Sequence, residues 1–118
     1  MMNKKYFWLD TETSGRSPKA GNQILSLAIV MENSLGEKVK ELDLKLKLKP
    51  EAVVEPKALS INGIDPYSPD WNSQAVTYED AKNLVLNFIM SEASSDSELI
   101  ALAYQASFDF DFFSKSFI

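Results

Sequence analysis

The 118-residue chain is long enough for one domain with a real core, and its content of 45% hydrophobic and 25% charged residues is ordinary for a globular protein. A net charge of −5 and a pI of about 4.7 argue against a broad basic face for nucleic acid. The absence of cysteine and histidine excludes disulfides, thiolate or histidine metal sites, and Ser-His or Cys-His nucleophiles in this chain. No apolar run is long enough to cross a membrane or form a signal peptide, so we expect a cytoplasmic location and no membrane partner.

The first predicted strand covers residues 5–9 and is followed directly by two acids, Asp10 and Glu12. Side chains at i and i+2 of an extended chain point to the same side, so these carboxylates project together. They raise each other's pKa unless a cation lies between them, and oxygen ligands alone suit Mg²⁺ or Mn²⁺. The alternative is a plain strand that ends in an acidic turn. The D-x-E pattern is short and common, so this stretch leaves both interpretations open.

Two more strands are predicted next, at residues 24–30 and 38–49, joined by a hairpin at residues 33–36. The second of them shows strict alternation of leucine with charged residues, mostly lysine. This pattern predicts an antiparallel strand near a sheet edge, with one face in the core and the other exposed to solvent. We interpret its lysines as a solvated face that protects the edge, in preference to a nucleic-acid patch.

The next two predicted elements are helices. A short helix is expected within residues 50–63, with Pro56 in its first turn and Gly63 as its C-terminal cap. After a turn-rich loop, Thr77 and Asp80 form a pair typical of a helix start. The apolar stripe of that helix comprises Ala81, Leu84, Val85, Phe88 and Ile89.

The remaining segments complete the expected topology. A polar linker at residues 91–97, too short to divide domains, precedes a buried strand at 99–103 and a helix from 108 to 118. The order β-β-β-α-α-β-α predicts a mixed α/β sheet with the first strand near its centre. The aromatic residues expected in the core are Trp8, Phe110, Phe113 and Phe117.

A third carboxylate, Asp109, stands at the start of the last predicted helix, just after a buried strand. If that strand pairs in parallel beside the first, its end lies near Asp10 and Glu12. Ligands commonly bind at the carboxyl ends of strands in α/β sheets. The sequence therefore predicts a metal centre with carboxylates from two strand ends.

Three segments together resemble the DEDD (DnaQ-like) 3′–5′ exonuclease family, which has an RNase H-like fold. Residues 8–15, WLDTETSG, resemble its first motif, D-x-E-T-T/S-G. Residues 58–64, ALSINGI, resemble the A-x-x-h-H/N-G-I segment, and residues 104–113, YQASFDFDFF, resemble the second motif, H-N-x-x-F-D-x-x-F-L. The resemblance covers essentially the whole chain, with the motifs in the family's order.

The resemblance implies two-metal hydrolysis of phosphodiester bonds at the 3′ ends of DNA or RNA, with Mg²⁺ or Mn²⁺. It implies that Asp10, Glu12 and Asp109 are the catalytic metal ligands. The residues that would contact the terminal nucleotide are Thr11, Thr13, Ser14, Ile64 and Phe108. For Phe108 a place in the core is an equal alternative, and Asp111 is interpreted as a surface residue.

The chain departs from the family pattern in two places. Tyr104 and Gln105 stand where the family commonly has His-Asn. The family's third motif, with a fourth carboxylate and a His or Tyr general base, is not found, and Tyr104 is not its equivalent. We therefore expect residues 1–118 to form the N-terminal two-thirds of a single exonuclease domain, weakly active or inactive alone. The alternative is a catalytically silent RNase H-like module that binds a partner chain or nucleic-acid ends, and an unpaired sheet edge would allow a homodimer.

Overall fold

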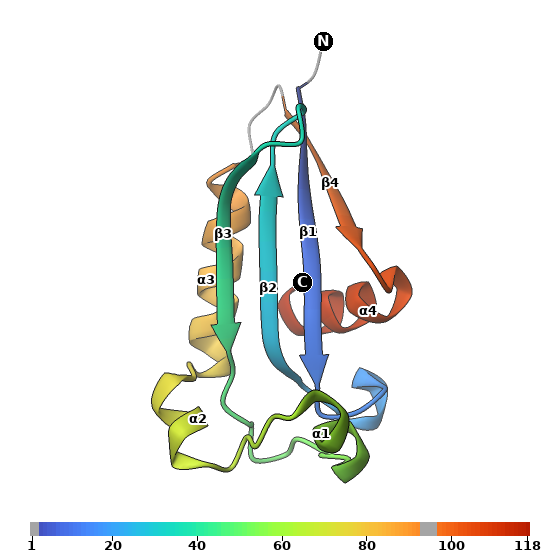
Figure 1. The fold of residues 1–118 in the computed structure, drawn as a ribbon, viewed down its shortest axis with the longest axis vertical. Coiled ribbons are helices and arrows are strands. Elements are labelled where there is room, and N and C mark those ends of the chain that lie inside the picture. Colours follow the sequence, from blue (N-terminus) through green and yellow to red (C-terminus); the bar gives the residue numbers. More distant parts are fainter. Residues whose placement is uncertain (1–2, 93–96) are drawn as a thin grey trace.

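In the computed structural model, which describes residues 3–92 and 97–118, strand β1 (Asn3–Thr13) lies inside a four-stranded sheet (Figure 1). Its neighbours are β2 (Ile24–Glu32), which is antiparallel, and β4 (Ser97–Ala103), which is parallel. Strand β3 (Lys38–Lys45) pairs antiparallel with β2, which gives the order β3-β2-β1-β4. The predicted mixed α/β sheet with the first strand in its interior is confirmed.

Strand β1 is longer than the sequence indicated. Its ladder with β2 continues to the pair Thr13–Ile24, so Asp10 and Glu12 belong to the strand and do not follow it. Its ladder with β4 stops at the pair Leu9–Ala103. The last four residues of β1 therefore have a strand on one side only, and the other side is left open beside the acidic residues.

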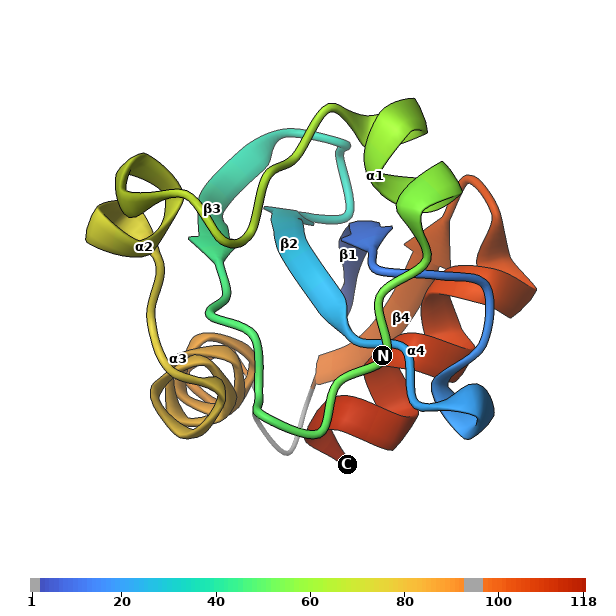
Figure 2. The same ribbon diagram turned by 90° about the horizontal axis from the view of Figure 1, so that it is seen from below.

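One face of the sheet carries the core. Helices α3 (Tyr78–Met90) and α4 (Ala106–Phe117) both pack on this face, and Figure 2 shows them on the same side of the strands. Phe7 and Leu9 of β1 point into this layer and are buried. Successive residues of a strand face opposite sides, so burial of these two side chains decides which residues of β1 face the core and which face away from it.

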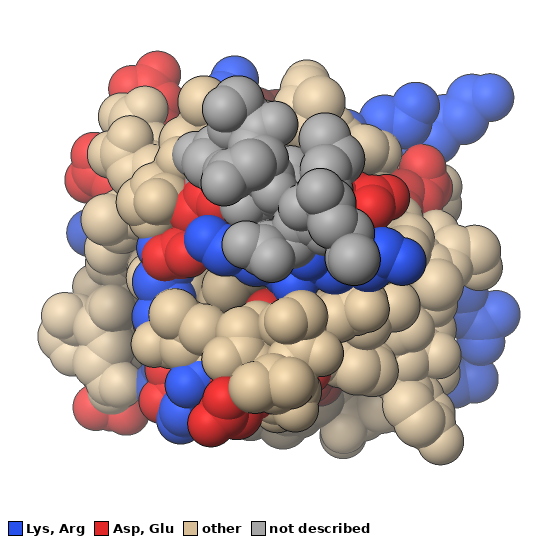
Figure 3. All heavy atoms as spheres, turned by 90° about the horizontal axis from the view of Figure 1, so that it is seen from above, with Lys and Arg blue, Asp and Glu red and all other residues tan. Residues whose placement is uncertain are grey.

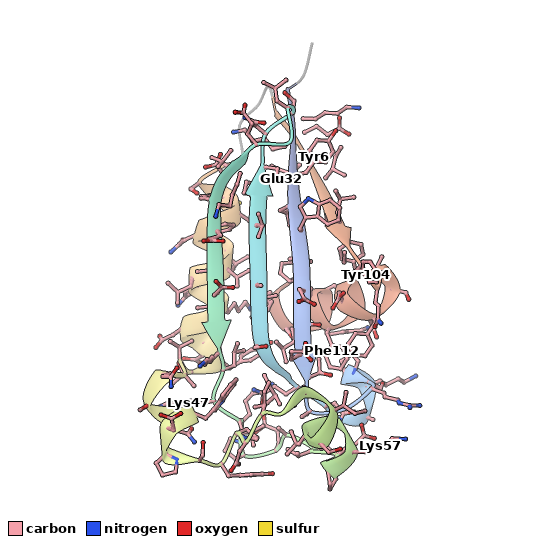
Figure 4. The ribbon with its side chains drawn as sticks, viewed as in Figure 1. Tyr6, Glu32, Lys47, Lys57, Tyr104 and Phe112 are labelled. Atoms are coloured by element: carbon pink, nitrogen blue, oxygen red, sulfur yellow. The ribbon has the colours of Figure 1, made fainter. Side chains whose placement is uncertain are left out.

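The opposite face of β1 carries Trp8, Asp10 and Glu12, all exposed. The prediction that Trp8 is a core residue was wrong: its side chain is 43% exposed. Its indole Nε1 donates a 2.5 Å hydrogen bond to Oε1 of Glu32, near the upper end of the sheet in Figure 4. The apolar run has large side chains on both faces, so composition did not reveal which face is inside.

Two short helices connect β3 to α3. Helix α1 (Pro56–Asn62) ends as predicted at Gly63, whose φ of 72° is the left-handed conformation that glycine adopts easily. Helix α2 (Pro69–Gln74) was not predicted, and its first two residues fall in the expected turn-rich loop at residues 65–70. The Ser68 hydroxyl caps it by accepting the Trp71 N–H at 3.1 Å. A 3-10 helix, η1 (Pro18–Ala20), lies within the predicted loop after β1.

Strand β3 ends at Lys45, four residues before the predicted end. Leu46 instead makes an isolated parallel bridge with Val76, and the Trp71 indole donates to the Leu46 carbonyl at 3.1 Å. Lys45 and Lys49 lie over the rings of Trp71 and Tyr78, so these two lysines are not simply a solvated face. Packing of α2 against this segment replaces the expected ladder.

Helix α3 begins after Thr77, whose hydroxyl accepts the Asp80 N–H at 3.2 Å, as predicted. Leu84 lies at the margin of its apolar stripe and is 42% exposed. In α4 the rings of Phe113 and Phe117 are buried, as predicted, and so is that of Phe112. Phe110, also predicted in the core, is only partly buried and packs against it. The predicted linker at 91–97 lies largely outside the described residues.

The described part of the chain holds no helix long and apolar enough to span a membrane. Figure 3 views the end of the molecule opposite α1. Blue lysine and arginine atoms lie there among red aspartate and glutamate atoms. Charges of both signs are therefore mixed over the part of this end that Figure 3 colours by charge.

Candidate functional site

A pocket of about 620 Å³ lies beside the last residues of β1, where β4 no longer pairs with it. Its walls come from three elements: the end of β1, helix α1, and the turn that joins β4 to α4. Figure 4 shows Tyr104 at this turn and Lys57 on α1, nearer the lower end of the view. The opening exists because β4 ends at Ala103 and the chain turns away into α4.

Asp10, Glu12 and Asp109 all line this pocket. The pKa of Glu12 is raised, first by its partial removal from water and then by the negative charges of Asp10 and Asp109. Glu12 is thus close enough to Asp10 and to Asp109 to feel the charge of each. Among the described residues, however, no three His, Cys, Asp or Glu side chains form a group that could hold a metal ion as they stand.

Asp109 reaches the pocket from the first turn of α4 and is only 4% exposed. Its Oδ1 accepts a 2.5 Å hydrogen bond from the Thr11 hydroxyl, which lies on the core side of β1. Asp10 and Glu12 lie on the other side of the same strand. The acids therefore approach from the two faces of β1 and meet around its unpaired edge.

The predicted nucleotide-contacting residues do not all lie in the pocket. Thr11, Thr13 and Phe108 line it, and Phe108 also packs on Phe112 with ring centroids 5.0 Å apart. Both interpretations of Phe108, pocket wall and core, therefore fit its position.

Ser14 lies outside the pocket wall and is fully buried. Its hydroxyl donates to the Val53 carbonyl at 2.7 Å and accepts the Gln23 N–H at 2.8 Å. These bonds hold the loop after β1 to the segment before α1. The geometry gives Ser14 a structural role at this position.

Ile64 also lies outside the pocket, whereas Ile61 lines it. The left-handed Gly63 turns the chain after α1, so residues on either side of it point in different directions. Asn62 fastens α1 to the site by donating from Nδ2 to the Thr13 carbonyl at 3.0 Å. The motif-like segment 58–64 thus contributes to the pocket through its helical part.

Sequence reasoning did not identify several other pocket residues, among them Arg16, Glu55 and Lys57. It named Tyr104 within the second motif-like segment but did not place it among the site residues. Arg16 follows the first motif-like segment, and its backbone N–H donates to Glu55 Oε2 at 3.0 Å. Arg16 and Lys57 are the basic side chains of the pocket, and neither forms an ion pair with another described residue. A basic residue in the loop next to D-x-E was the signal available in the sequence.

No known protein family and no curated protein is matched by this sequence. The structure of the chain is, however, similar to several solved structures. E. coli Exonuclease I in complex with a 5cy-dA13 oligonucleotide is 16% identical with a TM-score of 0.80, over 96% of this chain and 23% of that one. The chain has the fold of part of Exonuclease I.

Further Exonuclease I structures agree. The metal-free E. coli Exonuclease I complex with single-stranded DNA is 17% identical with a TM-score of 0.76, over 92% of this chain and 22% of that one. A moderately thermophilic Exonuclease I from Methylocaldum szegediense is 16% identical with a TM-score of 0.70, over 92% of this chain and 22% of that one. This chain spans less than a quarter of the length of the protein in each of these three structures. At such identities the likeness establishes the RNase H-like exonuclease fold.

Proposed function

We propose that the pocket binds the 3′ end of single-stranded DNA or RNA and supports metal-dependent 3′–5′ hydrolysis of its terminal phosphodiester bond. The observation that carries this proposal is the meeting of Asp10, Glu12 and Asp109 in one pocket at the carboxyl ends of β1 and β4. The fold supports it, because the similar Exonuclease I structures include complexes with single-stranded oligonucleotides.

The donor set fits a hard divalent cation. The side chains of Asp10, Glu12 and Asp109 offer oxygen alone. The pKa of Glu12 is raised first by its partial burial and then by the negative charges of the other two acids, which a bound cation would offset. These three residues would hold Mg²⁺ or Mn²⁺. Bound there, such cations would neutralise phosphate charge and lower the pKa of coordinated water. Asp109 has a second carboxylate oxygen available beside the one that Thr11 engages.

The basic side chains of the same pocket support binding of a polyanion. Arg16 and Lys57 line the same pocket as the acids, from the loop after β1 and from α1. They have no ion-pair partner among the described residues, so they are available to backbone phosphates. Thr11 holds the Asp109 carboxylate in place, and Asn62 holds α1 against the end of β1.

A second function has its own supporting observation. The described residues form no ready group of three metal-ligating side chains, and Asp109 is buried with one oxygen already engaged. Both features favour a catalytically silent module that binds nucleic-acid ends or a partner chain without metal.

Calorimetric titration with Mn²⁺ separates the two functions. The wild-type chain is compared with Asp10→Ala and with Asp111→Ala, a control that removes an exposed acid from α4 outside the pocket. The proposed site predicts heat of binding for wild type and Asp111→Ala, and its loss in Asp10→Ala. Equal heats in all three proteins would favour the silent module.

Recognition of the 3′ end is tested with two oligonucleotides of equal length and sequence, one linear and one circular. Fluorescence anisotropy with Mn²⁺ measures their affinities, and gel analysis of the linear strand labelled at its 5′ end follows removal of 3′ nucleotides. Preferential binding of the linear strand is expected, because the pocket accepts a chain end. Equal affinity for both strands would overturn the proposed function.

A further inference from the structure

Two large side chains on the wall of the pocket are mostly exposed to solvent. Tyr104, in the turn after β4, is 98% exposed, and Ile61, on α1, is 75% exposed. The Tyr104 hydroxyl forms no hydrogen bond with another residue of the described chain, and its ring packs on none of the described aromatic rings. At this exposure the Tyr104 ring contributes almost nothing to the stability of the fold.

The position of Tyr104 distinguishes it from other exposed apolar side chains. Tyr67 is 66% exposed but lies beside a different pocket, near Pro50 and Pro66. Tyr104 shares its pocket with the basic residues Arg16 and Lys57 and with the three carboxylates. An aromatic ring beside cations is the combination by which proteins bind single-stranded nucleic acid, with bases stacked on the ring and phosphates near the cations.

The pocket has room for such a ligand. Its volume of about 620 Å³ lies within the roughly 300–1,000 Å³ usual for small-ligand sites. The other aromatic residue of the pocket, Phe108, is partly buried and packs on Phe112, so its ring offers less free surface than that of Tyr104. Tyr104 is therefore the available stacking surface.

We infer that Tyr104 is a stacking platform for one unpaired base of the bound 3′ end, with Ile61 in contact with that strand from the α1 side. This inference rests on the proposed function and adds the residue of that site that would contact an unpaired base, with little preference for sequence. Stacking requires a base that has left its duplex, and every base presents an aromatic face to the ring.

The test measures the affinity of a linear single-stranded oligonucleotide for Tyr104→Ala, Tyr104→Phe and Tyr67→Ala proteins. We expect Tyr104→Ala to weaken binding roughly 5- to 150-fold, the range for loss of one base–aromatic stack. Tyr104→Phe keeps the ring and should remain within about threefold of wild type, as should the matched control Tyr67→Ala. Unchanged affinity of Tyr104→Ala would overturn the inference.

A second measurement identifies the stacked base. Single abasic nucleotides are placed in turn at the last four positions of the strand, and each affinity is measured with wild type and with Tyr104→Ala. One position should weaken binding to wild type and have no effect on Tyr104→Ala, because the same stack is already lost. Independent effects of the abasic nucleotide and the substitution at every position would exclude direct stacking.

The two failures are distinguishable. If the wild-type protein prefers linear to circular strands but Tyr104→Ala binds as tightly as wild type, the inference falls and the proposed function stands. If wild type does not distinguish linear from circular strands, the proposed function falls and the inference with it.

Discussion

The Thr11 hydroxyl of β1 donates a 2.5 Å hydrogen bond to the buried carboxylate of Asp109 on α4. This bond joins the two elements that supply the acids of the pocket, and it crosses the edge of β1 that β4 leaves unpaired. It gives one oxygen of a buried carboxylate the partner that burial requires. Thr11 thus acts on the site by positioning Asp109, as well as by lining the pocket.

Removal of this bond should destabilise the protein. Thr11→Val keeps the size of the side chain but leaves Asp109 without its donor, at an expected cost of about 1–3 kcal/mol in the free energy of unfolding. Thr11→Ser keeps the hydroxyl and should retain most of the stability. Urea denaturation of the three proteins checks this, and equal midpoints for Thr11→Val and wild type would contradict it.

Removal of charge at Glu12 should have the opposite effect. Its pKa is raised first by partial burial and then by the negative charges of Asp10 and Asp109, so ionised Glu12 is disfavoured in the folded protein. Glu12→Gln should therefore raise the free energy of unfolding at pH 7 by up to about 1 kcal/mol, and should weaken Mn²⁺ binding in calorimetry. Asp111→Asn, which removes an exposed acid from α4, is the control and should leave both unchanged. A less stable Glu12→Gln protein would show that the repulsion is not significant.

The charge of Glu92, a residue that does not line the pocket, should make the stability of the fold depend on pH. Its pKa is lowered, chiefly by a 3.1 Å hydrogen bond from Lys5 Nζ and further by Lys40, although burial opposes the shift. A lowered folded-state pKa contributes stability above the unfolded value of about 4.5, and this stability is lost as the pH falls through the folded pKa.

Glu92→Gln should consequently be less stable than wild type at pH 7, by about 0.2–1 kcal/mol. The difference should shrink below pH 4.5 and vanish in stronger acid, where Glu92 of the wild type is protonated as well. Thermal unfolding from pH 3 to 7 measures both proteins. A difference that stays constant over this range would show that the charge of Glu92 does not cause it.

Arg16 and Lys57 should determine how strongly binding depends on salt. Each contact between a cation and a phosphate of a single strand contributes about 0.7 to the slope of log affinity against log salt concentration. Arg16→Ala and Lys57→Ala should each reduce the slope by roughly this amount. Lys19→Ala is the control, because Lys19 is exposed in η1 and does not line the pocket. If Arg16→Ala and Lys57→Ala both keep the slope of wild type, neither residue contacts a phosphate of the bound strand.

Much of the local structure could be predicted from sequence because its causes are local. The Thr77 cap, the Gly63 helix end and the hairpin at residues 33–36 all follow from side chains and conformations within a few residues. Helix α2 was missed for the converse reason: its six residues carry no apolar stripe, and its Trp71 is held by a carbonyl of a distant segment.

Errors in burial arose where a residue's surroundings come from elsewhere in the chain. Trp8 is apolar but faces outward because Phe7 and Leu9 meet the helices. Ser14 belongs to a motif-like segment, yet its hydroxyl is used by Val53 and Gln23. Neither environment is visible in a short window of sequence.

The sequence alone determined that the side chains of Asp10 and Glu12 point to one side of an extended chain, because this alternation is a property of consecutive residues. That both belong to β1 itself was seen only in the structure. Only the tertiary structure decided that Asp109 joins them, and that Tyr104, Lys57 and Arg16 complete the walls. That outcome depends on where β4 stops pairing with β1 and on how α4 and α1 dock around the exposed edge. These are contacts between residues distant in sequence, and their geometry is decided when the sheet and its helices pack together.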